Sequence, residues 1–195
     1  LFVIAAVESS PALLASLCVA QATLVGHSQG VLVALETASR HPERVAALTL
    51  IAGAMAIPVN DALIEMSQSA PEKAFRMMTS WGHGPGAHKF DNTQPGHAFL
   101  GYGRRVMAQN DGAALHADLV ACNSYEGGKD AAASVTQPSL CLLAGKDKMT
   151  PVKFGRKMAE QISGAQYHVF ERAGHFLPAE FPIEVNDAMA AFLSH

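Results

Sequence analysis

The strongest constraint on the fold is a set of four short apolar runs that alternate with segments of helical periodicity. The runs are ATLVG (22–26), VAALTLIAG (45–53), SLCLLAG (139–145) and AQYHVF (165–170). Each run is mostly continuous rather than alternating, which is typical of strands buried on both faces of a parallel sheet. The sequence therefore predicts an α/β fold with a parallel sheet of about four strands flanked by helices.

The segments around these runs predict the helices that cover the sheet. A helix is expected from Ser28 to Arg40, and another after the third strand with Thr150 as its N-cap and Pro151 at its first position. Three apolar stripes at helical spacing support helices before the first strand, after the third and at the C-terminus. The stripes are Leu13, Leu14, Leu17 and Cys18; Phe154, Met158 and Ile162; and Ile183, Val185, Met189, Phe192 and Leu193.

The interval between the second and third strands has a different character. It contains four segments that favour helices, NDALIEM, APEKAFRMM, GRRVMAQ and ALHADLVAC, and one stretch rich in Gly, Pro and His without periodicity. We expect residues 54–137 to form a helical cap, or lid, over the strand ends. The core then consists of residues 1–53 and 138–195.

Length and charge exclude several classes of protein. A chain of 195 residues is long enough for one sizeable core, and its formal net charge of −3 comes without any cluster of basic residues, which argues against a nucleic-acid partner. No apolar run approaches the roughly 20 residues that a membrane helix requires. Cys18, Cys122 and Cys141 have no paired spacing, so we expect buried free thiols in a reducing, cytoplasmic compartment.

The pentapeptide Gly26-His27-Ser28-Gln29-Gly30 fits the pattern G-x-S-x-G, between a predicted strand and a predicted helix. In such a turn the Ser28 hydroxyl projects from the carboxyl end of the sheet, and the Gln29 amide can stabilise an oxyanion. We expect both glycines to be required, since side chains beside the serine would collide with backbone. The alternative for Ser28 is an ordinary helix N-cap.

A serine nucleophile requires a base, and the base requires an orienting acid, in the chain order Ser, Asp, His. Asp147 lies in the loop after the third strand and His175 in the loop after the fourth. Because the carboxyl ends of parallel strands meet at one edge of a sheet, we predict that Ser28, Asp147 and His175 form a catalytic triad. The alternative for Asp147 is a turn residue. His168 is expected in a strand and His41 at a helix end.

Four further residues are expected to contact a substrate: His27, Met149 and Phe176 beside the proposed triad, and Trp81 in the lid. Trp81, with Phe99 and Tyr102, could equally form the core of the lid. His83, His88 and His97 lack carboxylates or cysteines at ligand spacing, so no metal site is expected.

The segments ATLVGHSQGVLVAL, LLAGKDKMTPVKF and VFERAGHFLPAEF resemble the nucleophile, acid and histidine segments of the α/β-hydrolase family, in particular its small capped esterase-like members. The resemblance implies acyl transfer from carboxylic esters or related acyl substrates, with Ser28 as nucleophile, His175 as base and Asp147 as acid, and no cofactor. Two alternatives remain: a carbon–carbon bond hydrolase or lyase with the same triad, or a binding module that does not turn over.

The sequence departs from the family pattern in its N-terminal segment. Family members carry several strands before the turn that holds the nucleophile, which is called the nucleophile elbow and is formed here by residues 26–30. A loop after one of those strands supplies a second oxyanion donor. Here only VIAAVESSPALLASLCVA precedes the elbow strand. We therefore expect this chain to correspond to the C-terminal part of a hydrolase and to have weakened catalysis. We also expect the elbow strand to lie at an exposed edge of the sheet, where the chain could associate with another copy.

Overall fold

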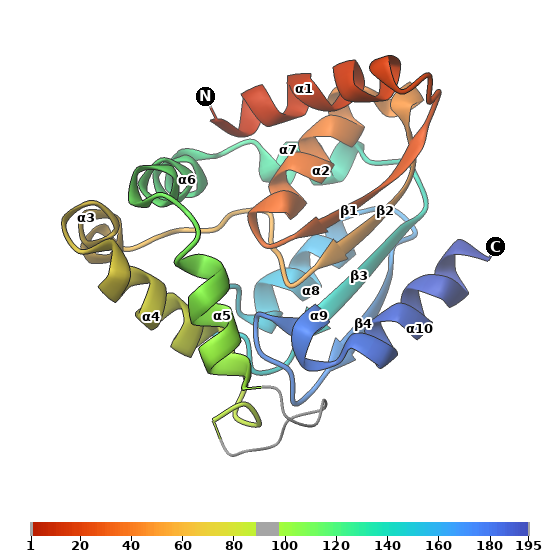
Figure 1. Cartoon of the computed structure of the whole chain (residues 1–195). Coiled ribbons are helices and arrows are strands. Elements are labelled where there is room, and N and C mark those ends of the chain that lie inside the picture. The colour runs from red at the N-terminus through yellow and green to blue at the C-terminus, as the bar shows by residue number, and fades with distance from the viewer. Residues whose placement is uncertain (1, 89–97, 195) are drawn as a thin grey trace.

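The computed structural model describes residues 2–88 and 98–194 and contains one parallel sheet (Figure 1). Its strands are β1 (Ala22–His27), β2 (Val45–Ile51), β3 (Ser139–Ala144) and β4 (Gln166–Phe170), hydrogen-bonded in the order β1-β2-β3-β4. The prediction of a four-stranded parallel sheet is confirmed, because each strand coincides with one of the apolar runs.

Helices cover both faces of this sheet. On one face lie α2 (Gln29–Arg40), α7 (Gly128–Ser134) and α8 (Val152–Gln161), and on the other lie the short α9 (Leu177–Glu180) and α10 (Pro182–Leu193). Helix α1 (Phe2–Ser16) packs on α2, and a 3₁₀ turn, η1 (Pro42–Arg44), leads into β2. His168 lies in β4 and His41 ends α2, as predicted.

The alternation of side chains along β3 explains why its sequence is apolar after Ser139. Cys141 and Leu143 point to the core beneath α2, α7 and α8, whereas Leu140 and Leu142 point to the core beneath α9 and α10. All six residues of the strand are buried. A central strand with two covered faces has no position for a polar side chain facing water.

The segment after β2 folds into four helices, which we call the lid; that they cover the strand ends stays a prediction. They are α3 (Asp61–Ser69), α4 (Pro71–Gly82), α5 (Phe99–Met107) and α6 (Gly112–Ser124). Leu63, Phe75, Met78 and Leu115 pack together as a core of their own. The sequence did not predict α7, whose Ala132 packs in the main core between α2 and α8. We therefore propose that the lid ends before α7 rather than at residue 137.

Two details of the helices differ from expectation. Leu13 and Leu17 are about 60% exposed and Cys18 is exposed, because α1 packs inward through Val7, which contacts Leu32 of α2. The prediction of a buried Cys18 is therefore wrong, whereas Cys122 and Cys141 are buried as expected.

The other correction concerns the start of α8. Pro151, not Thr150, is its N-cap residue, and the Thr150 hydroxyl makes hydrogen bonds elsewhere. The helix consequently begins one residue later than predicted.

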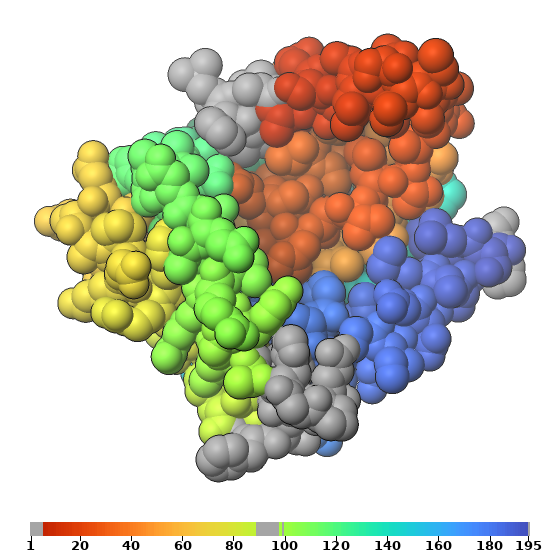
Figure 2. All heavy atoms as spheres, in the orientation of Figure 1, coloured from red at the N-terminus to blue at the C-terminus, as the bar shows by residue number. Residues whose placement is uncertain are grey.

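β1 lies at the edge of the sheet, as the sequence predicted. Val25 on this strand is 53% exposed. A hollow of about 620 Å³ lies nearby, between β1, β2 and α10 (Figure 2). Association of two copies through this edge stays a prediction. Among the helices in residues 2–88 and 98–194, none has the length and apolar character needed to cross a membrane.

Candidate active site

The turn between β1 and α2 places Ser28 in a strained backbone conformation. Its φ is 55° and its ψ is −120°, a region that residues other than glycine rarely adopt. The Ser28 N–H donates to the carbonyl of Ile51 (3.0 Å), which fixes the turn to the end of β2. The Ser28 hydroxyl makes no capping hydrogen bond to α2, so the alternative of an ordinary N-cap does not describe this residue.

The two glycines beside Ser28 are required to different degrees. A Cβ atom at Gly26 would lie 2.4 Å from the carbonyl oxygen of Gly30, whereas a Cβ at Gly30 would meet nothing within 4 Å. The steric reason that we gave for both glycines therefore holds for Gly26 and is wrong for Gly30.

This difference gives a matched pair of variants. Gly26→Ala is expected to lower the free energy of unfolding by about 3 kcal/mol or more, since backbone must move to admit the methyl group. Gly30→Ala should change it by less than about 1 kcal/mol, because Gly30 lies in a helix where alanine is favoured. Urea denaturation of both variants measures the two effects, and equal destabilisation would contradict the geometry.

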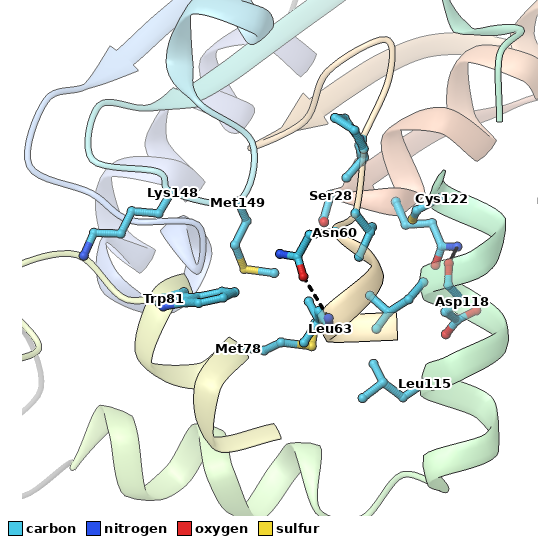
Figure 3. A pocket seen from close by; sticks show the side chains of 15 residues that line it. Ser28, Asn60, Leu63, Met78, Trp81, Leu115, Asp118, Cys122, Lys148 and Met149 are labelled. Carbon is cyan, nitrogen blue, oxygen red and sulfur yellow. Dashed lines mark hydrogen bonds between the residues drawn. The ribbon is translucent and has the colours of Figure 1, made fainter. Parts of the chain in front are cut away.

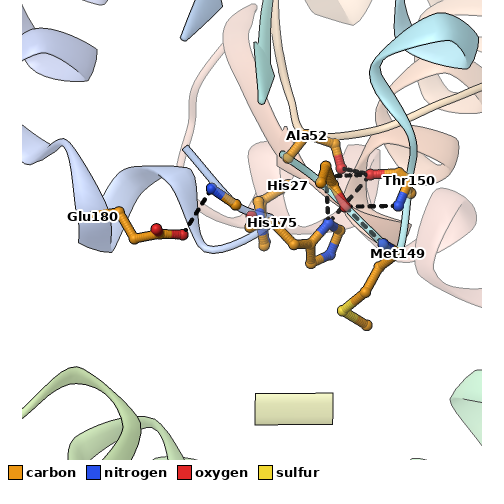
Figure 4. Close-up of polar contacts among 8 residues, drawn as sticks. His27, Ala52, Met149, Thr150, His175 and Glu180 are labelled. Carbon is orange, nitrogen blue, oxygen red and sulfur yellow. Dashed lines mark hydrogen bonds and ion pairs between the residues drawn. The ribbon is translucent and has the colours of Figure 1, made fainter. Parts of the chain in front are cut away.

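Asp147 and His175 form a buried hydrogen-bonded pair at the ends of β3 and β4 (Figure 4). The His175 Nδ1 lies 2.8 Å from the Asp147 Oδ2, and their side chains are 3% and 1% exposed. The other carboxylate oxygen, Oδ1, accepts hydrogen bonds from the N–H groups of Met149 and Thr150, each at 2.8 Å. Asp147 is thus more than a turn residue, because its carboxylate is also aimed at the imidazole.

Thr150 is a member of this cluster that sequence reasoning missed. Its hydroxyl lies 2.7 Å from both the Asp147 Oδ2 and the carbonyl oxygen of Ala52, and 3.2 Å from the His175 Nδ1. Ala52 itself has a positive φ of 45° at the end of β2. The spacing of Asp147 and Thr150, three residues apart in one loop, was a signal that could have indicated the contact.

His27 packs against His175 rather than on the wall of the cavity beside Ser28. Its Nε2 lies 2.7 Å from the carbonyl oxygen of His175, and the two ring centroids are 4.9 Å apart. Since a carbonyl oxygen only accepts, the His27 Nε2 carries the proton. Burial, followed by the proximity of His175, lowers the pKa of His27 and favours the neutral ring. His27 therefore connects the elbow to the loop after β4 that carries His175, which we call the histidine loop.

A cavity of about 260 Å³ lies between the core and the lid (Figure 3). Ser28, Gln29 and Met149 line it from the core side, and Trp81 and Leu115 line it from the lid. Of the predicted substrate contacts, Met149 and Trp81 thus lie at the cavity. In the described part of the chain, His27 and Phe176 are not among its lining residues.

Gln29 connects the elbow to the lid through its side chain. Its Nε2 donates to the backbone carbonyl of Asp118 in α6 (3.2 Å). Gln29 is also the first residue of α2, so its backbone N–H has no acceptor within that helix. Asp118 and Lys148 are the charged residues on the cavity lining, and burial raises the pKa of Asp118.

The other histidines and aromatic residues of the lid make contacts away from the Asp147–His175 pair. His83 is buried against the ring of Phe176, with its Nδ1 2.8 Å from the Thr79 carbonyl, and the His88 Nε2 lies 3.0 Å from the Ser80 carbonyl. Tyr102 is about half exposed. His97 and the side chain of Phe99 lie outside the described residues. Within the described ranges, no group of three or more metal-ligating side chains comes together.

Known proteins share both the sequence pattern and the fold. A family model for the alpha/beta hydrolase family matches residues 3–188. The structure resembles an esterase from Exiguobacterium antarcticum (TM-score 0.85, 18% identity) and an enol-lactonase from Burkholderia xenovorans (TM-score 0.87, 19% identity), covering 97% of this chain and 72% of each of theirs. It also resembles a thermophilic esterase (TM-score 0.78, 27% identity, 97% of this chain and 71% of that one). No curated protein matches the sequence. The chain belongs to the alpha/beta hydrolase family.

Proposed function

We propose that this protein is a serine hydrolase that cleaves carboxylic esters or related acyl compounds through Ser28, His175 and Asp147. One observation carries the proposal: Ser28 lies at a cavity in a strained conformation, with a hydroxyl that does not cap its helix. Strain of this kind costs on the order of 1–3 kcal/mol and is concentrated at functional sites. A nucleophilic role accounts for all three features, whereas a structural serine would account for none of them.

The proposed mechanism follows from the protonation of the Asp147–His175 pair. A carboxylate only accepts, so the His175 Nδ1–H donates to Asp147 and leaves the Nε2 lone pair available. His175 then takes the proton of the Ser28 hydroxyl as its oxygen attacks the acyl carbon, and returns that proton to the leaving group. Water then attacks the acyl carbon while His175 takes its proton, and His175 returns that proton to the Ser28 oxygen as the free acid leaves. No metal or organic cofactor takes part.

Stabilisation of the oxyanion is assigned to the backbone N–H of Gln29, at the first turn of α2. Among the described residues we identify one donor, whereas the family typically uses two.

The lining of the cavity favours an apolar acyl group. Side chains from the lid and the β2–α3 loop supply most of its wall, including Ile57, Leu63, Met78 and Leu119. Two structural relatives are described as an esterase and an enol-lactonase, and both compound classes contain the acyl–oxygen bond that the proposed mechanism cleaves. We therefore propose esters or lactones with a compact, largely apolar acyl part.

A fluorophosphonate probe tests the proposal without requiring fast turnover. It should react with the purified chain once per molecule, and mass spectrometry of the digested product should place the label on Ser28. Subsequent assays on ester, lactone, thioester and amide panels would then rank the substrates. Absence of labelling in a chain with native circular dichroism would show that Ser28 is not an activated nucleophile.

A further inference from the structure

A buried glutamate links the histidine loop to the lid. Glu180, at the end of α9, is 5% exposed. Its Oε1 accepts from the N–H of Gly174 (3.1 Å), and its Oε2 accepts from the N–H of Gly84 (2.9 Å). Figure 4 shows Glu180 with one of these two hydrogen bonds. Gly174 immediately precedes His175, and Gly84 follows the last helical turn of α4. One carboxylate therefore binds two segments that are 90 residues apart in the sequence.

The same lid segment also binds the residue that follows His175. The N–H of Phe176 donates to the carbonyl of Gly82 (2.9 Å). The residues on both sides of His175 are thus fixed to residues 82–84, one directly and the other through Glu180. The backbones are in close contact here, since a Cβ atom at Gly174 would lie 2.2 Å from the Gly84 nitrogen.

These contacts determine the position of the His175 backbone. The carbonyl of His175 accepts from the His27 ring, and its imidazole donates to Asp147. On the N-terminal side of His175, the Glu180 carboxylate holds the N–H of Gly174, and the N–H of Lys146 holds the carbonyl of Ala173 (2.8 Å). A shift of about 1 Å in a reacting group can cost about 100-fold in rate, so small movements of this loop would lower the reaction rate strongly.

The ionised carboxylate accepts both hydrogen bonds with no proton of its own, whereas a protonated Glu180 would have to turn its O–H away from both N–H groups. Burial raises the pKa of Glu180 to about 7, the two amide hydrogen bonds act in the opposite direction, and the nearby Asp147 and His175 respectively raise and lower it. The His83 ring of the lid is kept neutral, because burial lowers its pKa. The protein thus keeps a buried carboxylate whose ionisation is costly, which indicates a role beyond packing.

We propose that Glu180 is a positioning residue for His175, which keeps the base oriented by holding Gly174 against the lid segment 82–84. The inference rests on the proposed function, since it assigns a task relative to the base of that mechanism. It also implies that docking of the lid and orientation of the base are coupled, because the same carboxylate serves both.

Glu180→Gln tests the proposal, with Glu36→Gln as its matched control. The glutamine keeps the shape of the side chain and one acceptor, but directs an NH₂ group at one of the two N–H donors. Glu36 is a second buried glutamate, eight residues after Ser28 in the chain, which accepts from Tyr125 (2.5 Å) and Arg40 (2.6 Å). We expect fluorophosphonate labelling at pH 8 to slow by about 10- to 100-fold in Glu180→Gln and by less than twofold in Glu36→Gln.

Two further measurements separate positioning from a loss of fold. In the wild type, the folded state binds the Glu180 proton more tightly than the unfolded state, so this group lowers stability as pH rises from about 4.5 to about 7. Glu180→Gln should lack that component and remain folded at pH 8. The low-field Nδ1–H resonance of His175, observed by NMR, should shift or broaden in Glu180→Gln and not in Glu36→Gln.

The outcomes distinguish this inference from the proposed function. Wild-type labelling with equally fast labelling of Glu180→Gln would overturn the role of Glu180 and leave the hydrolase proposal intact. Failure of the wild type to label would overturn the hydrolase proposal. In that case an unchanged His175 resonance in Glu180→Gln would also refute the positioning role, and a changed one would support it.

Discussion

Replacing Ser28 with alanine is expected to abolish both fluorophosphonate labelling and ester turnover. The change removes the atom that attacks the acyl carbon, and loss of a triad serine typically lowers kcat by about 10⁶. Folding should be little affected, because the Ser28 hydroxyl caps nothing in α2 and the N–H bond to Ile51 is retained. The measurement compares labelling, turnover of a p-nitrophenyl ester and urea denaturation between variant and wild type.

Ser28→Gly sharpens this prediction, because it relieves the backbone strain that alanine retains. A positive φ costs glycine nothing, whereas the strain at Ser28 is on the order of 1–3 kcal/mol. The greater freedom of glycine in the unfolded chain offsets about 0.5–1 kcal/mol of that gain. Ser28→Gly should therefore be inactive yet more stable than Ser28→Ala by about 1 kcal/mol.

The two serine variants together decide what the strain is for. A gain in stability coupled to a total loss of labelling is expected if the conformation serves catalysis. Labelling of Ser28→Ala at the wild-type rate would show that the nucleophile is another residue. A loss of stability in Ser28→Gly would show that the elbow is not strained.

Asp147→Asn is expected to have the second largest effect, lowering the labelling rate by about 10⁴. The asparagine can keep the Oδ1 contacts with the N–H groups of Met149 and Thr150, so the loop should persist. At the other position, an NH₂ group would face the His175 Nδ1–H, which favours the imidazole form with its proton on Nε2. That form cannot accept the proton of Ser28.

Stability should fall by about 1–3 kcal/mol in Asp147→Asn, since one buried hydrogen bond to a charged group is lost. Asp187→Asn serves as the control, because Asp187 is exposed on α10. Its labelling rate should equal that of the wild type. The assignment of Asp147 as the acid would fail if Asp147→Asn kept a rate within tenfold of wild type while remaining folded.

Much of the fold followed from local patterns in the sequence. The four apolar runs predicted all four strands. Burial on both faces accounts for the run in β3, whose residues are all buried, whereas β4 has three exposed residues, Gln166, Tyr167 and His168, at its start. The helices α2, α4 and α10 were recognisable because their apolar spacing or first-turn proline acts within a few residues. By contrast, α7 was missed, since its short alanine-rich turn is stabilised by packing between α2 and α8 rather than by its own sequence.

Errors in the prediction have the same origin. The stripe containing Leu13 and Leu17 did predict a helix, but it did not predict which side of α1 would find a partner. Gly30 fitted the motif, yet only the three-dimensional turn shows that the space around it is open. Threonine is a residue type typical of N-caps, but the Thr150 hydroxyl instead contacts Asp147 and the carbonyl of Ala52, which follow different strands.

The sequence by itself determined the class of fold, its four parallel strands and the three residues that lie at the carboxyl ends of strands. These properties depend on periodicity and on motif order, which are local in the chain. The tertiary structure alone decided that Ser28 is strained, that Thr150 joins the acid and that Glu180 binds the histidine loop to the lid. Each of these depends on atoms brought together from distant segments, and hydrogen bonds over such separations leave no periodic signal in a single sequence.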